Sequence, residues 1–231
     1  MVQQIIGRTT KGMDWMVNQS KEMMGKMLTV YFIAGTQDIV EGTLPECLEQ
    51  ALEAGITCFQ YREKGRGSLA TYEERKAMAL ICQKLCQDYQ VPLIINDDLK
   101  LALEIGADGI HVGQNDVRIQ EIIKLSEPTM LIGLSCHSEN EVSAANQLLE
   151  VDYYGIGPVY QTTSKVDAEP AIGVSKLGEL TRIAEKPVVA IGGIQLGNAK
   201  EIDSPVGVAV ISAITQAENI LEVVEKLVMR S

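Results

Sequence analysis

The sequence predicts a single-domain α/β protein of the (β/α)8 TIM-barrel class. Eight short apolar runs alternate with helical patterns between residues 28 and 229, without a shift in composition. Most runs lack strict alternation of apolar and polar residues, as is typical of parallel strands that helices cover. Eight such units fit a closed barrel better than an open doubly wound sheet. The open sheet would also carry G-x-G-x-x-G after its first strand, where this chain has AGTQD at 34–38.

The predicted elements follow one another from the first strand onward. Strands are predicted at 28–34, 58–63, 92–97, 108–113, 130–135, 151–157, 187–193 and 207–212. Helices with recognisable signals are predicted at 69–89, 138–149 and 217–229. Thr71 and Glu74 give the first of these helices a capping box. Ser138 and Glu141 do the same for the second, and the third carries its apolar residues on one face.

Residues 1–26 differ from the rest of the chain, and we interpret them as an N-terminal extension to a catalytic barrel domain at 27–231. They combine a cluster of methionines with scattered charges and show no sustained apolar periodicity. We expect this extension to be disordered, a loosely docked helix, or a product of an upstream start or of expression.

The composition excludes several classes of protein. Asp and Glu number 31 against 20 Lys and Arg, and the formal net charge of −11 opposes unspecific binding to nucleic acids or anionic membranes. The chain has neither an apolar run long enough to span a membrane nor the apolar segment of a secretory signal. Its five cysteines lack the C-x-x-C spacing of a zinc site or a redox motif. Five reduced thiols are typical of a protein in a reducing compartment. We therefore expect a cytoplasmic protein that binds neither nucleic acids nor membranes, and the sequence leaves monomer and homo-oligomer both open.

Polar residues stand at nearly every predicted strand end, where barrels place their catalytic groups. In the second strand, alternation sends Gln60, Arg62 and Lys64 to one side. Two cations and an amide on one face would bind a polyphosphate. Arg62 would donate two parallel hydrogen bonds from its planar guanidinium group, and Lys64 would contribute a single positive charge. A solvated loop is the competing interpretation of this stretch taken alone.

Aspartates follow the third and fourth strands. Because adjacent strands bring their ends together, we expect Asp97 and Asp116 to face each other. Two carboxylates beside a cationic clamp indicate Mg²⁺ that carries a phosphorylated substrate. Asp98 is predicted to cap the next helix instead. His111 lies inside a strand pattern, where a buried structural histidine is commoner than a catalytic one.

Hydroxyl groups, a lysine and a glycine mark the later strand ends, as they do in the phosphate sites of many barrels. They are Ser135 after the fifth strand, Thr162, Ser164 and Lys165 after the sixth, Gly193 after the seventh, and Ile211 with Ser212 after the eighth. Two anion-binding elements are therefore predicted, one linked to magnesium near the second to fourth strands and one without metal near the sixth to eighth. Two phosphorylated groups are implied.

Taken in order, these motifs resemble the thiamine-phosphate synthase (thiamine-phosphate pyrophosphorylase) family over residues 28–229. The resemblance rests on QYREK, NDD, HVGQND, GLSCH, GPVYQTTSK, GGI and VISAI. Each motif is short, but their order and intervals make the set specific. The chain departs from the family pattern at Ser164, which replaces a threonine, at Gln161, where proline is common, and in a shortened segment at 198–206.

The resemblance implies a transferase of thiamine biosynthesis that joins hydroxymethylpyrimidine diphosphate to a thiazole phosphate, carboxylated or not, and releases pyrophosphate. It implies Mg²⁺ as cofactor, held by Asp97 and Asp116. The implied ligands of the pyrimidine diphosphate are Gln60, Arg62, Lys64, Asn96, Ser135 and Lys165, and those of the thiazole phosphate are Thr162, Ser164, Gly193, Ile211 and Ser212. The implied catalytic residues are Arg62, Lys64, Ser135 and Lys165. A dissociative displacement needs such charge stabilisation and no protein nucleophile.

Two alternatives remain open at this point. A thiazole tautomerase, a related barrel, uses no diphosphate substrate, so the joint presence of the cations and the two aspartates disfavours it. A non-catalytic barrel that binds thiamine or thiazole phosphates is the other alternative, and an intact magnesium pair argues against it.

Overall fold

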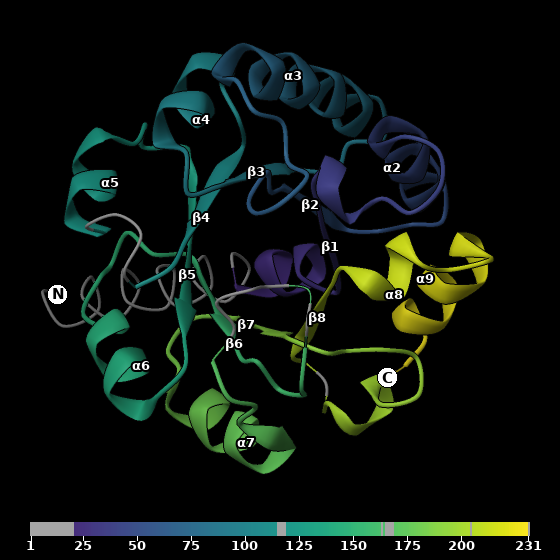
Figure 1. Cartoon of the computed structure of the whole chain (residues 1–231). Helices are drawn as coiled ribbons and strands as arrows, with labels where there is room; N and C mark the ends of the chain where they lie inside the picture. The colour runs from purple at the N-terminus through teal and green to yellow at the C-terminus, as the bar shows by residue number, and fades with distance from the viewer. Residues whose placement is uncertain (1–20, 115–118, 163, 165–168, 204, 231) are drawn as a thin grey trace, which may run out of the picture.

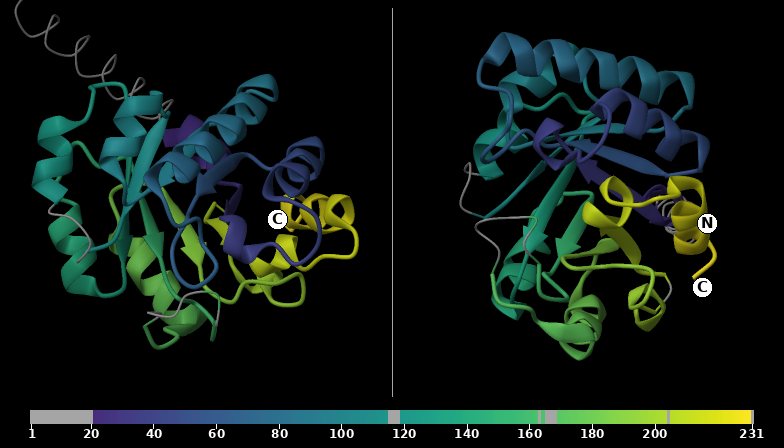
Figure 2. Two further views of the ribbon diagram at one scale, coloured as in Figure 1. Left: turned by 45° about the horizontal axis from the view of Figure 1, so that its top comes forward. Right: turned by 45° about the vertical axis from the view of Figure 1, so that its right-hand side comes forward.

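The chain folds into a closed barrel of eight parallel strands. The computed structural model describes residues 21–114, 119–162, 164, 169–203 and 205–230. The strands pair in sequence order from β1 to β8, and β8 closes on β1 through the register pairs Val30–Val208 and Phe32–Val210. Figure 1 looks along the barrel with its helices around it, and Figure 2 shows the arrangement from two other directions. The predicted fold class is confirmed.

The eight strands coincide with the eight apolar runs of the sequence. They are Val30–Ala34 (β1), Cys58–Tyr61 (β2), Leu93–Asn96 (β3), Gly109–Val112 (β4), Leu131–Cys136 (β5), Tyr153–Ile156 (β6), Val188–Ile191 (β7) and Gly207–Val210 (β8). Every residue of β1, β2, β4, β6 and β8 is buried. One face of each strand packs against helices and the other fills the barrel, which explains why the runs lack alternation.

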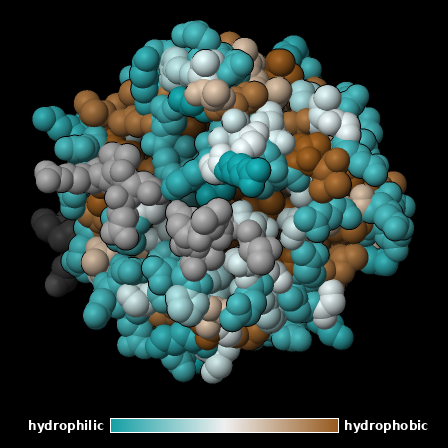
Figure 3. All heavy atoms as spheres, in the orientation of Figure 1, coloured by the Kyte–Doolittle hydropathy of each residue, from teal (hydrophilic) through white to brown (hydrophobic). Residues whose placement is uncertain are grey.

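Helices cover the outside of the barrel. The α-helices are Leu44–Glu53 (α2), Tyr72–Asp88 (α3), Leu99–Ile105 (α4), Ile119–Leu125 (α5), Glu139–Ala145 (α6), Gly173–Ile183 (α7), Ser212–Thr215 (α8) and Ile220–Val228 (α9). The 3₁₀ helices Thr36–Asp38 (η1) and Ala199–Glu201 (η2) follow β1 and β7. In the part of the chain that the structure describes, no helix is long and apolar enough to cross a membrane. On the face shown in Figure 3, hydrophilic side chains prevail and apolar ones show mainly in patches between helices.

The capping box predicted for α3 forms completely, whereas the one predicted for α6 forms only in part. At α3 both halves form, because Glu74 N donates to Thr71 Oγ1 at 3.2 Å and Thr71 N donates to Glu74 Oε2 at 2.9 Å. At α6, Ser138 Oγ accepts from Glu141 N at 3.3 Å, but the Glu141 carboxylate accepts from the backbone N–H of His137 instead of that of Ser138.

Helix α6 is also shorter than the predicted helix at 138–149, since it ends at Ala145. The next residue, Asn146, uses its side chain for contacts with other elements. Its Nδ2 donates to Ile183 O at 2.8 Å, and its Oδ1 accepts from Tyr154 Oη at 3.0 Å. These tertiary contacts mark the point where the chain leaves the helix.

Large side chains fill the inside of the barrel, and glycines make room for them. Tyr31 of β1 and Tyr153 of β6 meet across the interior, with ring centroids 6.0 Å apart. Gly133 of β5 leaves the necessary space, because a Cβ there would lie 2.2 Å from Tyr153 Cζ and 2.4 Å from His111 Nδ1. The rings of Tyr153 and His111 can therefore pack at a centroid distance of 5.5 Å.

Residues 21–27 form a helix immediately before β1. Met24 and Met27 pack against the interior cluster that contains Leu28 and Tyr31. Through Met24, residues 21–26 of the predicted extension are thus in contact with the barrel. Residues 1–20 lie outside the described residues, so the division of the chain at residues 26 and 27 stays a prediction.

The five cysteines are buried thiols without disulfide partners. Burial raises the pKa of Cys47 to about 11 and the pKa values of Cys86 and Cys136 to about 12. These thiols stay protonated near neutral pH, so they serve packing rather than nucleophilic chemistry.

The close approach at Gly133 predicts that Gly133→Ala destabilises the barrel. The added methyl group would overlap the Tyr153 and His111 rings, and overpacking of this kind costs about 1–3 kcal/mol. Urea unfolding followed by circular dichroism measures the change. Gly178→Ala in α7 is the control, because nothing lies within 4 Å of a Cβ there and alanine stabilises a helix interior by about 0.5–1 kcal/mol. Equal stability of Gly133→Ala and the wild type would contradict the packing described.

Candidate active site

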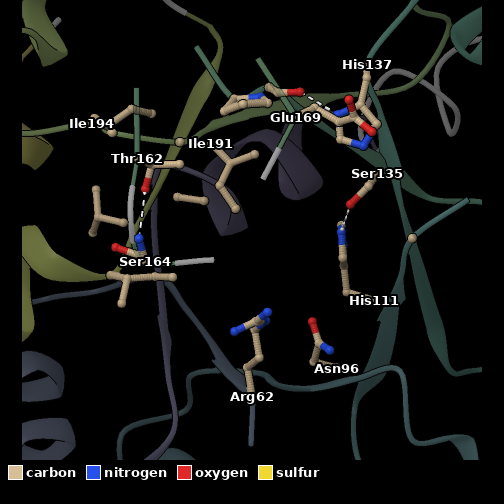
Figure 4. A pocket seen from close by; sticks show the side chains of 18 of the residues that line it. Arg62, Asn96, His111, Ser135, His137, Thr162, Ser164, Glu169, Ile191 and Ile194 are labelled. Atoms are coloured by element: carbon tan, nitrogen blue, oxygen red, sulfur yellow. Dashed lines mark hydrogen bonds between the residues drawn. The ribbon is translucent and has the colours of Figure 1, made fainter. Parts of the chain in front are cut away.

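A pocket of about 380 Å³ opens where the strands end. Its walls come from the carboxyl ends of β2 to β8 and from the loops that follow them (Figure 4). The predicted site residues that line it are Arg62, Lys64, Asn96, Asp97, Ser135, Thr162, Ser164, Gly193, Ile211 and Ser212. Residues from most of the length of the chain therefore share one cavity, which is of a size typical for small-molecule ligands.

Three predicted site residues are not part of that lining. Asp116 and Lys165 lie outside the described residues, and their roles stay predictions. Gln60 is buried inside the barrel, where its Nε2 donates to Tyr31 Oη at 2.8 Å. A direct contact between Gln60 and a substrate also stays a prediction.

Arg62 and Lys64 form the cationic wall of the pocket at the end of β2, on one side as predicted. Arg62 is only 5% exposed, and its side chain points into the cavity (Figure 4). Glu63, between the two cations, accepts hydrogen bonds from the segments that follow β1 and β2. Its carboxylate accepts from Thr36 N at 2.7 Å and from Leu69 N at 2.8 Å. The two cations thus extend from a fixed backbone, as a preorganised anion clamp requires.

Asp97 places a carboxylate beside the cationic wall, just after β3. Its Oδ2 is 3.3 Å from Lys64 Nζ and accepts from Asn96 Nδ2 at 2.7 Å. Asp97 has a φ of 61°, in the left-handed region that residues with a Cβ rarely adopt. Backbone strain of this kind tends to persist at functional positions. Asp98 caps α4 as predicted, because its Oδ1 accepts from Leu101 N at 3.0 Å.

The donor set on this side of the pocket fits a magnesium ion. Asp97 offers hard carboxylate oxygens on the pocket wall, and its side chain is 22% exposed. The described residues contain no group of three or more His, Cys, Asp or Glu side chains that could hold a metal by themselves. Mg²⁺ usually binds through one or two carboxylates and completes its shell with water and substrate phosphates, so the Asp97 carboxylate is a donor of the type that this ion takes.

Glycines after β7 bring the backbone close to the loop after β6. Gly192 and Gly193 have φ angles of 98° and 64°. A Cβ on Gly193 would lie 2.3 Å from Gln161 O, and one on Gly192 would lie 2.3 Å from Pro158 Cβ. Only glycine fits either position. Gly192 and Gly193 form a glycine turn that lies against the loop after β6, and Gly193 was predicted to share a ligand with that loop.

Hydroxyl groups border the pocket near this glycine turn. Figure 4 shows Thr162 and Ser164 close together, away from Arg62, and Ser164 N donates to Thr162 Oγ1 at 3.3 Å. Ser212, the first residue of α8, accepts at Oγ from Gln195 Nε2 at 2.9 Å. Hydroxyl and backbone groups of this kind are suited to the oxygens of a phosphate group.

One side chain keeps the glycine turn in place despite the shortened segment at 198–206. Asn198 Nδ2 donates to Gly193 O at 3.0 Å, and its Oδ1 accepts from Gln195 N at 2.9 Å. Tyr160 Oη donates to Asn198 O at 3.1 Å and links the turn to the loop after β6. The departure from the family pattern thus leaves this wall of the pocket tied together.

His111 is buried in the barrel and also lines the pocket, so both the structural and the functional interpretation of this residue apply. It is 8% exposed, yet it lines the pocket. Its Nε2 lies 3.0 Å from Ser135 Oγ and its Nδ1 lies 3.2 Å from Tyr153 Oη. The ring is therefore held at both nitrogens, and Ser135, its partner at Nε2, also lines the pocket.

The structure adds polar residues to the pocket that the sequence reasoning did not assign. They are Gln114, His137, Glu141 and Glu169. Gln114 Nε2 donates to Ser135 O at 2.9 Å, and His137 Nδ1 lies 2.5 Å from Gly157 O. Gln114 and His137 follow predicted strands, so the rule about strand ends could have identified them. Glu141 had been assigned to helix capping, and Glu169 carries no local signal.

Known proteins resemble this chain over most of its length. A family model described as thiamine monophosphate synthase matches residues 30–214. A thiamine-phosphate synthase from Listeria innocua is 59% identical over 203 residues, 87% of this chain and 95% of that protein. One from Actinobacillus succinogenes is 48% identical over 216 residues, 89% of this chain and 97% of that protein.

A solved structure agrees with these sequence comparisons. The thiamine phosphate pyrophosphorylase from Pyrococcus furiosus has a TM-score of 0.78 to this chain and is 31% identical to it, covering 90% of this chain and 96% of that one. The ordered motifs, the barrel, the pocket and the relatives all agree. This chain belongs to the thiamine-phosphate synthase family.

Proposed function

We propose that the chain transfers the hydroxymethylpyrimidine group from its diphosphate to the nitrogen of a thiazole phosphate, giving thiamine phosphate and pyrophosphate. The observation that carries this proposal is that a wall with two cations and a carboxylate and a wall with hydroxyl groups and a glycine turn meet in one pocket. Arg62, Lys64 and Asp97 suit a diphosphate bound with magnesium. Thr162 and Gly193 belong to the other wall, which suits a single phosphate. Such small-molecule substrates are in keeping with an action in the cytoplasm.

This reaction depends on charge stabilisation and placement more than on proton transfer. The bond between the pyrimidine methylene carbon and the diphosphate oxygen breaks, and the thiazole nitrogen uses its lone pair to form the new C–N bond. Arg62 and Lys64 stabilise the charge that develops on the departing pyrophosphate. Ser135 adds a hydroxyl group on the pocket wall between them and the later strands. The aminopyrimidine ring delocalises the transient cation, so the chain needs no nucleophilic side chain.

Asp97 and Asp116 would hold the Mg²⁺ ion that this proposal includes. When bound, the ion supplies positive charge at the diphosphate oxygens. Lys64 and Asn96 hold the Asp97 carboxylate through the same oxygen, Oδ2, and so limit its orientation. The carboxylate is thereby placed before any ligand binds.

Incubation of the purified protein with both substrates, with and without Mg²⁺, tests the function. We expect equal amounts of thiamine phosphate and pyrophosphate, formed with Mg²⁺ and not without it. Isomerisation of a thiazole carboxylate phosphate without coupling would favour a tautomerase. Ligand binding without any turnover would favour a non-catalytic binding protein. Either of these results overturns the proposal.

We predict that Asp97→Asn lowers magnesium-dependent turnover by about 10²-fold, because it removes a charged ligand from beside the diphosphate. Asp98→Asn is the matched control, since asparagine also caps a helix and Asp98 caps α4. Both variants should keep the far-ultraviolet circular dichroism of the wild type. Turnover measured over a range of Mg²⁺ concentrations distinguishes the two. Wild-type turnover in Asp97→Asn would show that this carboxylate holds no essential ion.

We also predict that Arg62→Lys lowers kcat/KM for the diphosphate substrate roughly 10–100-fold, because lysine keeps the charge but loses the planar fork. Arg66→Lys, at an exposed position in the following loop, is the control. Steady-state kinetics with the thiazole phosphate at saturation measures the effect. A similar kcat/KM for both variants would mean that Arg62 acts through its charge alone.

A further inference from the structure

Five side chains form a continuous chain of hydrogen bonds through the barrel interior. Gln60 Nε2 donates to Tyr31 Oη at 2.8 Å. Tyr31 Oη lies 2.8 Å from Tyr153 Oη, which lies 3.2 Å from His111 Nδ1. His111 Nε2 then lies 3.0 Å from Ser135 Oγ. This series of hydrogen bonds begins inside the barrel at Gln60 of β2. It ends at His111 of β4 and Ser135 of β5, which both line the pocket.

The inner part of this chain is shielded from water. Gln60, Tyr31 and Tyr153 are all buried to 1% exposure or less. Burial raises the pKa values of Tyr31 and Tyr153 well above their ordinary value, so both phenols keep their hydrogens. A buried hydroxyl group without a partner is costly. Each of these hydrogens must therefore find an acceptor nearby.

Donor and acceptor roles can be assigned along these hydrogen bonds from Gln60 to Ser135, which we call the forward direction. The Nε2 group of Gln60 can only donate, so Tyr31 Oη accepts there. In the forward direction, Tyr31 donates its own hydrogen to Tyr153. Tyr153 then donates to His111 Nδ1. In this direction the imidazole accepts at Nδ1, so its hydrogen lies on Nε2 and is donated to Ser135 Oγ. The Ser135 hydrogen consequently points away from His111.

The opposite direction leaves one hydrogen poorly placed. Tyr31 would accept from both Gln60 and Tyr153, and its own hydrogen would have to turn toward its register neighbour, Cys58. Burial raises the pKa of Cys58 well above its ordinary value, so this neighbour is a neutral thiol. A thiol is a weak hydrogen-bond acceptor. The forward direction gives both tyrosine hydrogens strong acceptors.

We propose that Tyr153 is a positioning residue that holds His111 as its Nε2–H tautomer and thereby makes the Ser135 hydroxyl group a donor to the pocket. The role in catalysis rests on the proposed function, in which this donor meets an oxygen of the departing pyrophosphate. A donor that is already oriented needs no reorganisation as negative charge develops. Gln60 and Tyr31 support the same arrangement from below.

The tautomer can be measured directly because the chain has two histidines, His111 and His137. In protein with ¹⁵N-labelled histidine, long-range proton–nitrogen spectra show which ring nitrogen carries the hydrogen. His137→Gln serves to assign the signals. We expect Nε2–H for His111 in the wild type and a mixture of tautomers in Tyr153→Phe, which removes the hydroxyl group and keeps the ring.

Tyr154→Phe is the matched control. Tyr154 is the neighbour of Tyr153 on β6 and is equally buried. Its hydroxyl group instead donates to Oδ1 of Asn146, the residue that follows α6, at a distance of 3.0 Å. Tyr153→Phe loses two hydrogen bonds, to Tyr31 and to His111, and Tyr154→Phe loses one, so we expect the larger loss of stability in urea unfolding for Tyr153→Phe. If Tyr153 has only a structural role, neither variant changes the tautomer of His111.

Kinetics adds a second measurement of the same variants. We expect Tyr153→Phe to lower kcat about tenfold with little change in the KM of the diphosphate, and Tyr154→Phe to change neither. Wild-type tautomer and kcat in Tyr153→Phe, or an Nδ1–H tautomer in the wild type, overturns the proposal. If Tyr153→Phe does not fold, an Nδ1–H tautomer of His111 in the wild type still overturns the proposal. If the wild type makes no thiamine phosphate, the proposed function fails, and the spectra alone decide whether Tyr153 sets the tautomer.

Discussion

The filling of the barrel interior is the constraint on which the other features of this structure depend. Eight parallel strands enclose a space that side chains must occupy, since a barrel of this size is a packed core and not a pore. Tyr31 and Tyr153 fill its centre and join their hydroxyl groups at 2.8 Å. They can do so because Gly133 has no side chain. The interior is thus closed beneath the strand ends, and a pocket remains above it.

The pocket has two walls with different chemistry, and each is held by hydrogen bonds between neighbouring loops. Glu63 ties the loops after β1 and β2 beneath the cationic wall. Asn198 ties the glycine turn after β7 from within the shortened segment. Both contacts fix backbone rather than a substrate group. They let the side chains that face the cavity be placed before a ligand arrives, which lowers the cost of ordering them on binding.

The acidic composition and the anionic ligands of this family are compatible because charge is distributed unevenly. Lysines on the outer helices pair with carboxylates, as in Lys76 with Glu104 and Lys176 with Glu179. Such exposed pairs contribute little to stability. Arg62 is buried at the pocket, where the dielectric is lower and the same charge acts more strongly. The net charge of −11 therefore says much about the surface and little about the site.

The sequence by itself determined the order of the strands, the class of the fold and ten of the residues that line the pocket. Strand periodicity, caps and strand-end polar groups are local patterns, and a parallel barrel always brings its strand ends together. The tertiary structure alone decided which inward side chains meet. Gln60 reaches Tyr31, and Tyr153 reaches His111, because of the strand register and the space at Gly133. No local pattern encodes contacts between residues so far apart, and for the same reason only the fold shows that α6 ends at Asn146.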